Sequence, residues 1–240
     1  MLVFDLETIA DKDNESYLNY KLGSFSAPST WKDPEKIARN IEEQKQKAMQ
    51  KLSLSPMTGR IAIAGFISDD LNLPWLKISP FEDRQDELYS IVTFGLDGQT
   101  EKTIIEMMLM IINNSYQDGH SLITYNGKAF DLPFLFTRAI LKGIAKPKDL
   151  PPITDYISKY PPRQPFIPHI DLFNILNPGY GDWSGLSEWS YLLGDTNEPF
   201  GEGNKVQEWF DTNQYDKIKE HLISDLHKTL YLADRVLKWI

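Results

Sequence analysis

The stretch Met1-Leu-Val-Phe-Asp5-Leu-Glu7-Thr-Ile9 decides the fold of this chain. Its apolar and β-branched residues predict a buried β-strand. Asp5 and Glu7 interrupt the strand two residues apart, so both carboxylates point to the same face. Two like charges on a core strand repel each other and are costly to desolvate. A bound divalent cation offsets that cost through oxygen ligands, so we expect further carboxylates to complete a metal site over this strand.

The composition limits the class of protein. The 240 residues suffice for one large domain with a full core, and 41% apolar and 25% charged residues are ordinary for a soluble globular protein. The absence of cysteine excludes disulfides, thiolate catalysis and cysteine-ligated metals. Because no apolar run could span a bilayer and no signal-peptide pattern precedes the first strand, we expect a cytoplasmic protein with no membrane partner.

The net charge of −9 bears on possible partners. It argues against tight, extended duplex binding that depends on phosphate contacts alone. It does not argue against a nucleic-acid enzyme, because bound metal ions offset carboxylate charge locally.

We predict a single domain, residues 1–240, with a loop-plus-helix insertion at about 11–52 that borders the functional cleft. The first part of the insertion, up to Trp31, is polar and is predicted to be irregular loop. Asp33 as N-cap and Pro34 at the first helical position predict the start of a surface helix.

The other elements predict an α/β fold. Strands are expected at 60–68, 74–78, 90–94, 122–125 and 167–172. Helices are expected at 101–116, 130–141, 186–193, 205–210 and 215–239, and a proline-rich ordered loop at 145–168. This order predicts a mixed five-stranded sheet, three antiparallel strands followed by two parallel ones, flanked by helices.

Two further acidic positions are candidates for the metal site. Asp131 begins an apolar helix just past a strand end, where ligands collect in such sheets, although a first-turn acid also complements a helix dipole. His221 and Asp225 are four residues apart at the edge of the apolar face of the last helix, although such a pair also occurs on helix surfaces. Each acid alone could have a purely structural role, but four acids beside apolar helices and strands are harder to explain in that way. We expect them to converge.

Three stretches carry this pattern: Phe4-Asp5-Leu6-Glu7-Thr8, Asn126-Gly127-x-x-Phe130-Asp131-x-Pro133, and the late helical Asp225. They resemble the three motifs of the DEDD superfamily of 3′–5′ exonucleases, which has a ribonuclease H-like fold. The second stretch is similar to the form found in proofreading domains of family-B DNA polymerases and their stand-alone relatives. The resemblance thins between Asp11 and Lys51 and in the proline-rich loop.

The resemblance implies a 3′–5′ exonuclease acting on single-stranded DNA with two Mg²⁺ or Mn²⁺ ions, about 3.5–4 Å apart, at the scissile phosphate. The four acids match the metal ligands of the superfamily. His221 stands where one subclass has tyrosine, whereas the histidine of the other subclass lies one residue earlier. A neutral imidazole at this position can act as general base.

Several alternatives remain open at this stage. Thr8, Asn126 and Lys128 are candidates for substrate contacts, and Asp171 is expected to support the site or the strand that carries it. RNA is an alternative substrate on the same fold, because the contacts to the 2′-OH that would distinguish it are not visible in the sequence. A catalytically weak nucleic-acid-binding module is a further alternative. A replication or repair protein is a possible partner.

Overall fold

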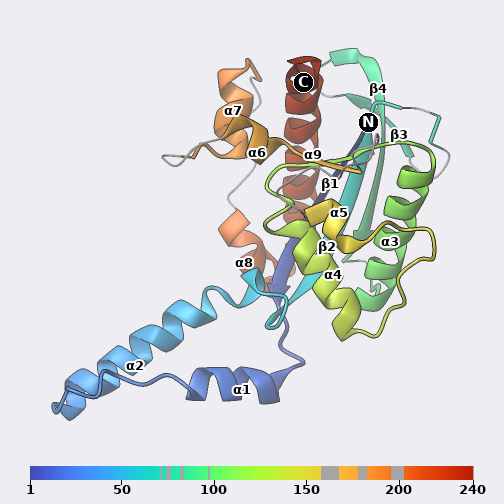
Figure 1. The fold of residues 1–240 in the computed structure, drawn as a ribbon. Helices are drawn as coiled ribbons and strands as arrows, with labels where there is room; N and C mark the ends of the chain where they lie inside the picture. The colour runs from blue at the N-terminus through green and yellow to red at the C-terminus, as the bar shows by residue number, and fades with distance from the viewer. Residues whose placement is uncertain are drawn as a thin grey trace.

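A computed structural model describes residues 1–70, 72–73, 77–81, 84–96, 98–157, 168–177, 183–195 and 203–239. Its centre is a six-stranded sheet in the order β3-β4-β2-β1-β5-β6 (Figure 1). The strands are β1 Leu2–Ala10, β2 Gly59–Ser68, β3 Lys77–Phe81, β4 Arg84–Gly95, β5 Leu122–Thr124 and β6 His169–Asp171. β1, β2, β4 and β3 pair antiparallel, whereas β5 and β6 run parallel to β1.

The predicted α/β class and mixed sheet are confirmed, but the sheet has six strands where five were expected. Six strand segments were expected along the chain, counting β1, so the predicted total was one too low; the edge strand β3, expected at 74–78, pairs with β4. The sequence around this hairpin is polar and contains proline, so it carries only a weak strand pattern. The expected strand at 74–78 overlaps β3 at its end, and residues 74–76 lie outside the described part of the chain.

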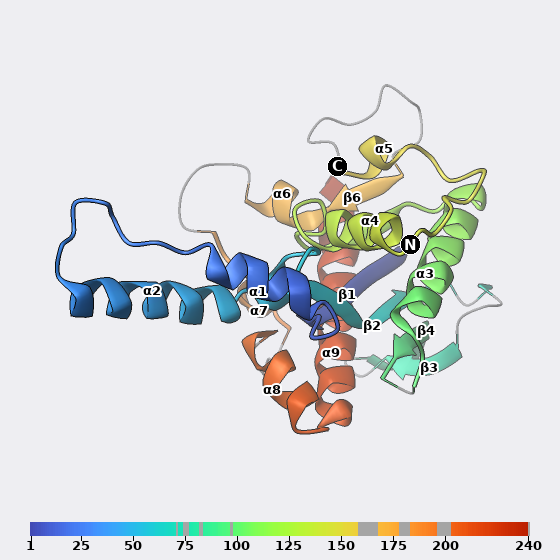
Figure 2. The same cartoon turned by 90° about the horizontal axis from the view of Figure 1, so that it is seen from below.

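Helices cover both faces of the sheet (Figures 1 and 2). One face of β1, with Leu2, Phe4 and Leu6, packs in a core with α3 and α4, and the other, with Val3 and Ile9, packs against α9. The α-helices are α1 Glu15–Gly23, α2 Pro34–Met49, α3 Glu101–Gln117, α4 Asp131–Leu141, α5 Ile153–Ile157, α6 Leu172–Leu176, α7 Leu186–Leu192, α8 Val206–Asp211 and α9 Tyr215–Val236. Short 3-10 turns are η1 Leu52–Leu54, η2 Gly203–Lys205 and η3 Leu237–Trp239.

The start of α2 follows the expectation from the sequence. The Asp33 carboxylate accepts hydrogen bonds from the amides of Glu35 at 3.0 Å and Lys36 at 3.3 Å, and Pro34 opens the helix. These bonds satisfy amides that have no partner within the helix.

Two stretches expected to be irregular contain helices. α1 lies inside the predicted loop that precedes α2, and it buries none of its residues. Without a buried stripe the sequence has no helical period to detect, which explains the error. Likewise, α5 lies inside the proline-rich stretch, of which residues 158–167 fall outside the described part.

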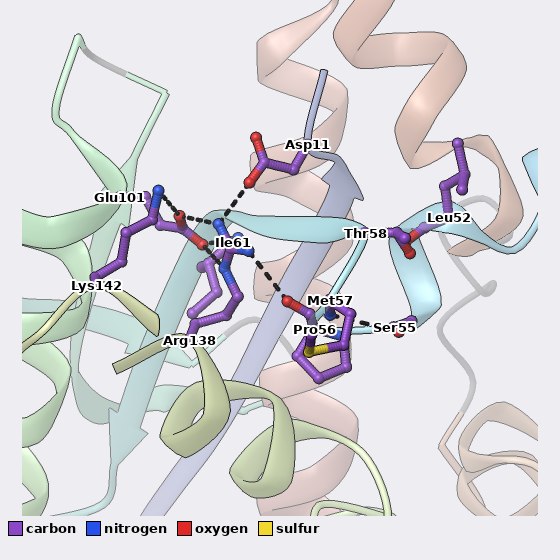
Figure 3. A network of polar contacts seen from close by, with 10 residues as sticks. All are labelled: Asp11, Leu52, Ser55, Pro56, Met57, Thr58, Ile61, Glu101, Arg138 and Lys142. Atoms are coloured by element: carbon purple, nitrogen blue, oxygen red, sulfur yellow. Dashed lines mark hydrogen bonds and ion pairs between the residues drawn. The ribbon is translucent and has the colours of Figure 1, made fainter. Parts of the chain in front are cut away.

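A buried ion network ties together the base of the insertion (Figure 3). Arg138 of α4 donates through Nε and Nη2 to the two carboxylate oxygens of Glu101 at 2.7 and 2.6 Å. Nη2 also donates to Asp11, where the chain leaves β1, at 2.7 Å, and Nη1 donates to the carbonyl of Pro56 at 3.0 Å. Glu101 also accepts from the amide of Ile61 on β2. Both ends of the insertion are therefore fixed to α3 and α4.

Gly65 of β2 lets α9 approach the sheet closely. A Cβ at this position would lie 2.8 Å from the Leu226 Cδ1 atom and 3.1 Å from Leu222 Cδ2, so these two leucine side chains of α9 would have to shift to accommodate it. Gly65 pairs with Asp5 in the β1–β2 ladder. The close approach therefore brings α9 next to the acids of β1. Among the described residues, no helix has the length and apolar character needed to cross a membrane.

Candidate active site

A cleft of about 690 Å³ lies beside β1, between the start of α4 and the end of the chain that carries α7, η2 and α9. Asp5 and Glu7 of β1, Asp131 of α4, and His221 and Asp225 of α9 all line it. The five predicted residues thus come from three elements far apart in the sequence and meet at one place, as expected for the four acids.

Asp131 reaches the strand from the first turn of α4. Its residue is 4% exposed, and its carboxyl group hydrogen-bonds the backbone of Leu6 and the side chain of Asp5. No side chain caps this helix start, since Phe130 is at the N-cap position. The carboxylate of Asp131 is therefore directed to β1 and does not act as an N-cap.

His221 lies among the acids of the cleft. Its Nε2 atom is 3.3 Å from Glu7 Oε1 and 3.8 Å from Asp225 Oδ2. The imidazole ring also packs edge-to-face on Trp209 of α8, with ring centroids 6.0 Å apart. The Lys228 ammonium, one turn further along α9, is 3.3 Å from Asp225 Oδ1. The i, i+3 spacing of Asp225 and Lys228 could have shown this pair in the sequence.

The acids of the cleft perturb one another. Burial, together with the charges of Asp131, Glu7 and Asp225, raises the pKa of Asp5 well above its usual range. Burial and the charges of Asp225 and Asp131 do the same to the pKa of Glu7. Burial, with a contribution from Asp171, raises the pKa of Asp131 to about 7. Each shift means that the ionised cluster lacks sufficient positive charge.

A divalent cation fits this donor set. Oxygen atoms of Glu7 and Asp225 and a ring nitrogen of His221 lie within 4.8 Å of one another, which is close enough for one ion to contact all three. Hard cations prefer carboxylate oxygens, and manganese also accepts imidazole. Asp5 and Asp131 adjoin the same cleft and supply the remaining carboxylates.

The turn that leads to Asp131 is held by Asp171 at the end of β6. The Asp171 carboxylate accepts hydrogen bonds from the amides of Asn126 at 2.8 Å and Lys128 at 2.9 Å, and from Phe173 of α6. Asn126 has φ 68°, a left-handed conformation that asparagine tolerates better than most residues. Gly127 leaves no room for a Cβ, which would lie 2.3 Å from Thr124 Oγ1. This geometry explains the Asn-Gly pair of the second motif.

The other predicted contact residues lie at different depths. Asn126 lines the cleft. Thr8 is buried beside an irregularity in the pairing of β1 with β2, and neither Thr8 nor Lys128 belongs to the described lining of the cleft. The stretch Gly185–Glu188 also lines the cleft, but it was not expected to, because its sequence has no charge pattern that could have marked it.

Two further histidines are structural. His169 bridges the Tyr156 carbonyl and the Thr124 hydroxyl, and burial lowers its pKa to about 3, so the ring is neutral. His227 packs against Tyr89 and contacts its hydroxyl group at 3.1 Å. Of His169, His221 and His227, only His221 lines the cleft.

The comparison with protein families decides the relationship. A family model described as a predicted 3′–5′ exonuclease related to the exonuclease domain of PolB matches residues 74–238, well over half of the chain. The chain belongs to this family. The match begins after β1, so Asp5 and Glu7 lie outside the matched residues. A comparison with curated proteins gives no match.

A comparison with solved structures also finds this fold in a family B DNA polymerase. The chain is similar to the family B DNA polymerase from the hyperthermophilic archaeon Pyrobaculum calidifontis, with a TM-score of 0.54 and 16% sequence identity. The similarity covers 98% of this chain and 24% of the polymerase chain. The predicted resemblance to this group and the ribonuclease H-like α/β fold are both confirmed.

Proposed function

We propose that this family member is an active, metal-dependent 3′–5′ exonuclease that hydrolyses phosphodiester bonds at the 3′ ends of single-stranded DNA. The observation that carries the proposal is the meeting of Asp5, Glu7, Asp131 and Asp225 at one cleft, with a deficit of positive charge. A purely structural cluster of buried acids would be paired throughout with fixed cations, whereas among the described residues of this cluster only Asp225 has a lysine beside it, Lys228.

Asp5, Glu7, Asp131 and Asp225 would hold two divalent ions, Mg²⁺ or Mn²⁺. When bound, such ions neutralise phosphate charge and assist both the attacking and the leaving oxygen of an in-line displacement. The four side chains come from β1, from α4, which packs on one face of β1, and from α9, which packs on the other, so the ligands are held in place before substrate arrives.

His221 would accept a proton from the attacking water at Nε2. This atom faces Glu7 and Asp225, and a neutral ring with its proton on Nδ1 presents a basic Nε2 to the cleft. Trp209 supports the ring from behind, so the imidazole is oriented by packing.

The cleft has the dimensions of a site for a small ligand. Its volume of about 690 Å³ is suited to a terminal nucleotide and not to a double helix. Asn126 and Tyr125 border the space, where they could contact the last sugar or base. We therefore propose a single-stranded 3′ end as the substrate. A replication or repair protein is the proposed partner, because such a protein would supply these ends.

The test is stepwise shortening of 5′-labelled single-stranded DNA and RNA in Mg²⁺ or Mn²⁺, resolved on sequencing gels. We expect a ladder of DNA products from the wild-type protein and none from Asp5→Asn. Asp149→Asn, which changes an exposed acid on a loop after α4, is the matched control and should behave as wild type.

The outcomes separate the candidate functions. Faster shortening of RNA than of DNA would assign an exoribonuclease in place of a DNA exonuclease. Binding without shortening, unchanged by Asp5→Asn, would assign a nucleic-acid-binding module and refute the enzyme.

A further inference from the structure

Residues 12–51 form an arm that projects from the domain (Figures 1 and 2). It consists of α1, an outward segment 24–31, and α2, which returns beside that segment. The structure describes every residue of the arm, and none of them is buried. Because these 40 residues add no buried side chain to the core, core packing does not explain why they are ordered. Exposed segments of this kind usually serve binding.

The base of the arm is fixed next to the cleft. The amide of Ala10 donates to Gln207 of α8 at 2.7 Å, and the Lys12 ammonium donates to Asp211 of the same helix at 2.7 Å. Trp209, between these two residues of α8, packs on His221. One short helix therefore contacts both the root of the arm and the histidine of the cleft.

The arm differs in charge from the rest of the protein. It carries eight Lys and Arg against six Asp and Glu, whereas the other 200 residues carry 17 against 28. Lys36 and Lys47 are exposed and eleven residues apart, which places them on one side of α2, and exposed Lys51 follows towards the base. The arm is therefore net positive, whereas the rest of the protein is strongly acidic, and a polyanion that leaves the acidic cleft would meet a less repulsive surface on this arm.

Aromatic side chains accompany the lysines. Tyr20 is 74% exposed, and its ring lies 6.3 Å from that of Tyr17 on α1. On α2, the Lys36 ammonium lies 4.1 Å above the ring of Trp31. An exposed aromatic ring such as that of Tyr20, near cationic side chains, is a surface on which a single-stranded base can stack while phosphates are neutralised.

We propose that the arm is a platform for the single-stranded part of the nucleic-acid substrate, several nucleotides away from the 3′ end in the cleft. This inference rests on the proposed function, because it assigns the arm to the same substrate. α2 alone spans about 24 Å at 1.5 Å per residue, so the platform can contact a strand only beyond a minimum length.

The test is fluorescence anisotropy with labelled oligothymidylates of 5 and 20 nucleotides, in EDTA and on an Asp225→Asn background that prevents degradation. We expect the 20-mer to bind at least about tenfold more tightly than the 5-mer. The arm variant Lys36→Ala/Lys47→Ala/Lys51→Ala should lose about tenfold affinity for the 20-mer, with a salt slope lower by about 2. Its binding of the 5-mer should equal that of the parent.

Two further variants separate charge from stacking. Tyr20→Ala should weaken binding of the 20-mer about tenfold without a change in the salt slope, because it removes a stacking surface and no charge. Lys102→Ala/Lys148→Ala/Lys238→Ala removes the same charge from exposed positions outside the arm and should bind as the parent does. Circular dichroism of each variant checks the fold.

The results distinguish this inference from the proposed function. If the wild-type protein shortens the 5-mer while the arm variants bind the 20-mer like the parent, the arm proposal is wrong and the exonuclease stands. If the wild-type protein shortens no oligonucleotide, the proposed function fails independently. A change in sedimentation of the protein itself on altering the arm, with DNA binding intact, would assign the arm to contacts between copies of the chain and overturn the proposal.

Discussion

Two clusters of buried acids stand at opposite ends of α4, and they differ in how their charge is balanced. At its start, Asp131 joins Asp5 and Glu7; burial raises the pKa of all three, and the neighbouring acids add to the shifts of Asp5 and Glu7. Further along, Glu101 and Asp11 share Arg138 at 2.6–2.7 Å. The second cluster carries its own cation and fastens elements together, whereas the first lacks sufficient cation and is suited to acquire one.

The largest effect should come from removing a carboxylate from the cleft. Asp131→Asn should lower exonuclease activity by at least about 10³-fold, since metal stabilisation of transition-state charge contributes several kcal/mol. The same change should raise the stability of the metal-free protein, because it relieves repulsion on β1. Gel assays and urea unfolding in EDTA measure the two effects. Lower stability in EDTA would show that Asp131 is structural.

The balanced cluster should respond in the opposite way. Arg138→Met leaves Glu101 and Asp11 buried without their main cation, so we expect a loss of about 3–5 kcal/mol in unfolding free energy. Urea unfolding with and without Mg²⁺ measures it, and Mg²⁺ should not restore the loss. A change below 1 kcal/mol would mean that Lys142, 3.2 Å from Glu101, and water suffice to balance these acids.

A smaller effect is expected at His221. His221→Ala should reduce the turnover rate by about 10²-fold, which is the lower end of the contribution expected from a general base. The affinity for Mn²⁺ should change less than in Asp131→Asn. Turnover rates and Mn²⁺ titration calorimetry separate the two roles. If Mn²⁺ affinity falls as far as in Asp131→Asn, His221 is mainly a metal ligand.

A further effect concerns pH. Because the pKa of Asp131 rises from 3.8 to about 7 on folding, its contribution to stability is complete below about pH 3.8 and is lost as the pH rises through 7. In EDTA, wild-type stability relative to Asp131→Asn should therefore fall with pH over this window, by at most about 1.4 kcal/mol per pH unit. His169, whose pKa is lowered, contributes with the opposite sign in both proteins and cancels from the difference.

Saturating Mg²⁺ should flatten this pH dependence, because a cation stabilises the ionised carboxylates. Urea midpoints at a series of pH values give the curve. A wild-type stability that rises with pH relative to Asp131→Asn over this window would contradict the charge deficit of the cleft.

The same two clusters show which features the sequence could reveal. Asp5 and Glu7 share one strand and one face, so their conflict with burial is visible locally. Asp11, Glu101 and Arg138 lie up to 127 residues apart with no shared pattern, so their network follows only from the packing of α3 on α4. The close approach of α9 over Gly65 is likewise a tertiary contact. Local sequence patterns predicted the acids of the cleft and most of the helices and strands. They did not predict the tertiary contacts that bring these helices and strands together.

The most direct test of the charge deficit is anomalous scattering from crystals grown with Mn²⁺. We predict two difference peaks among the carboxylates of Asp5, Glu7, Asp131 and Asp225, and none at the Arg138 network. No peak in the cleft at saturating Mn²⁺, or a peak at Glu101 and Asp11, would contradict the account.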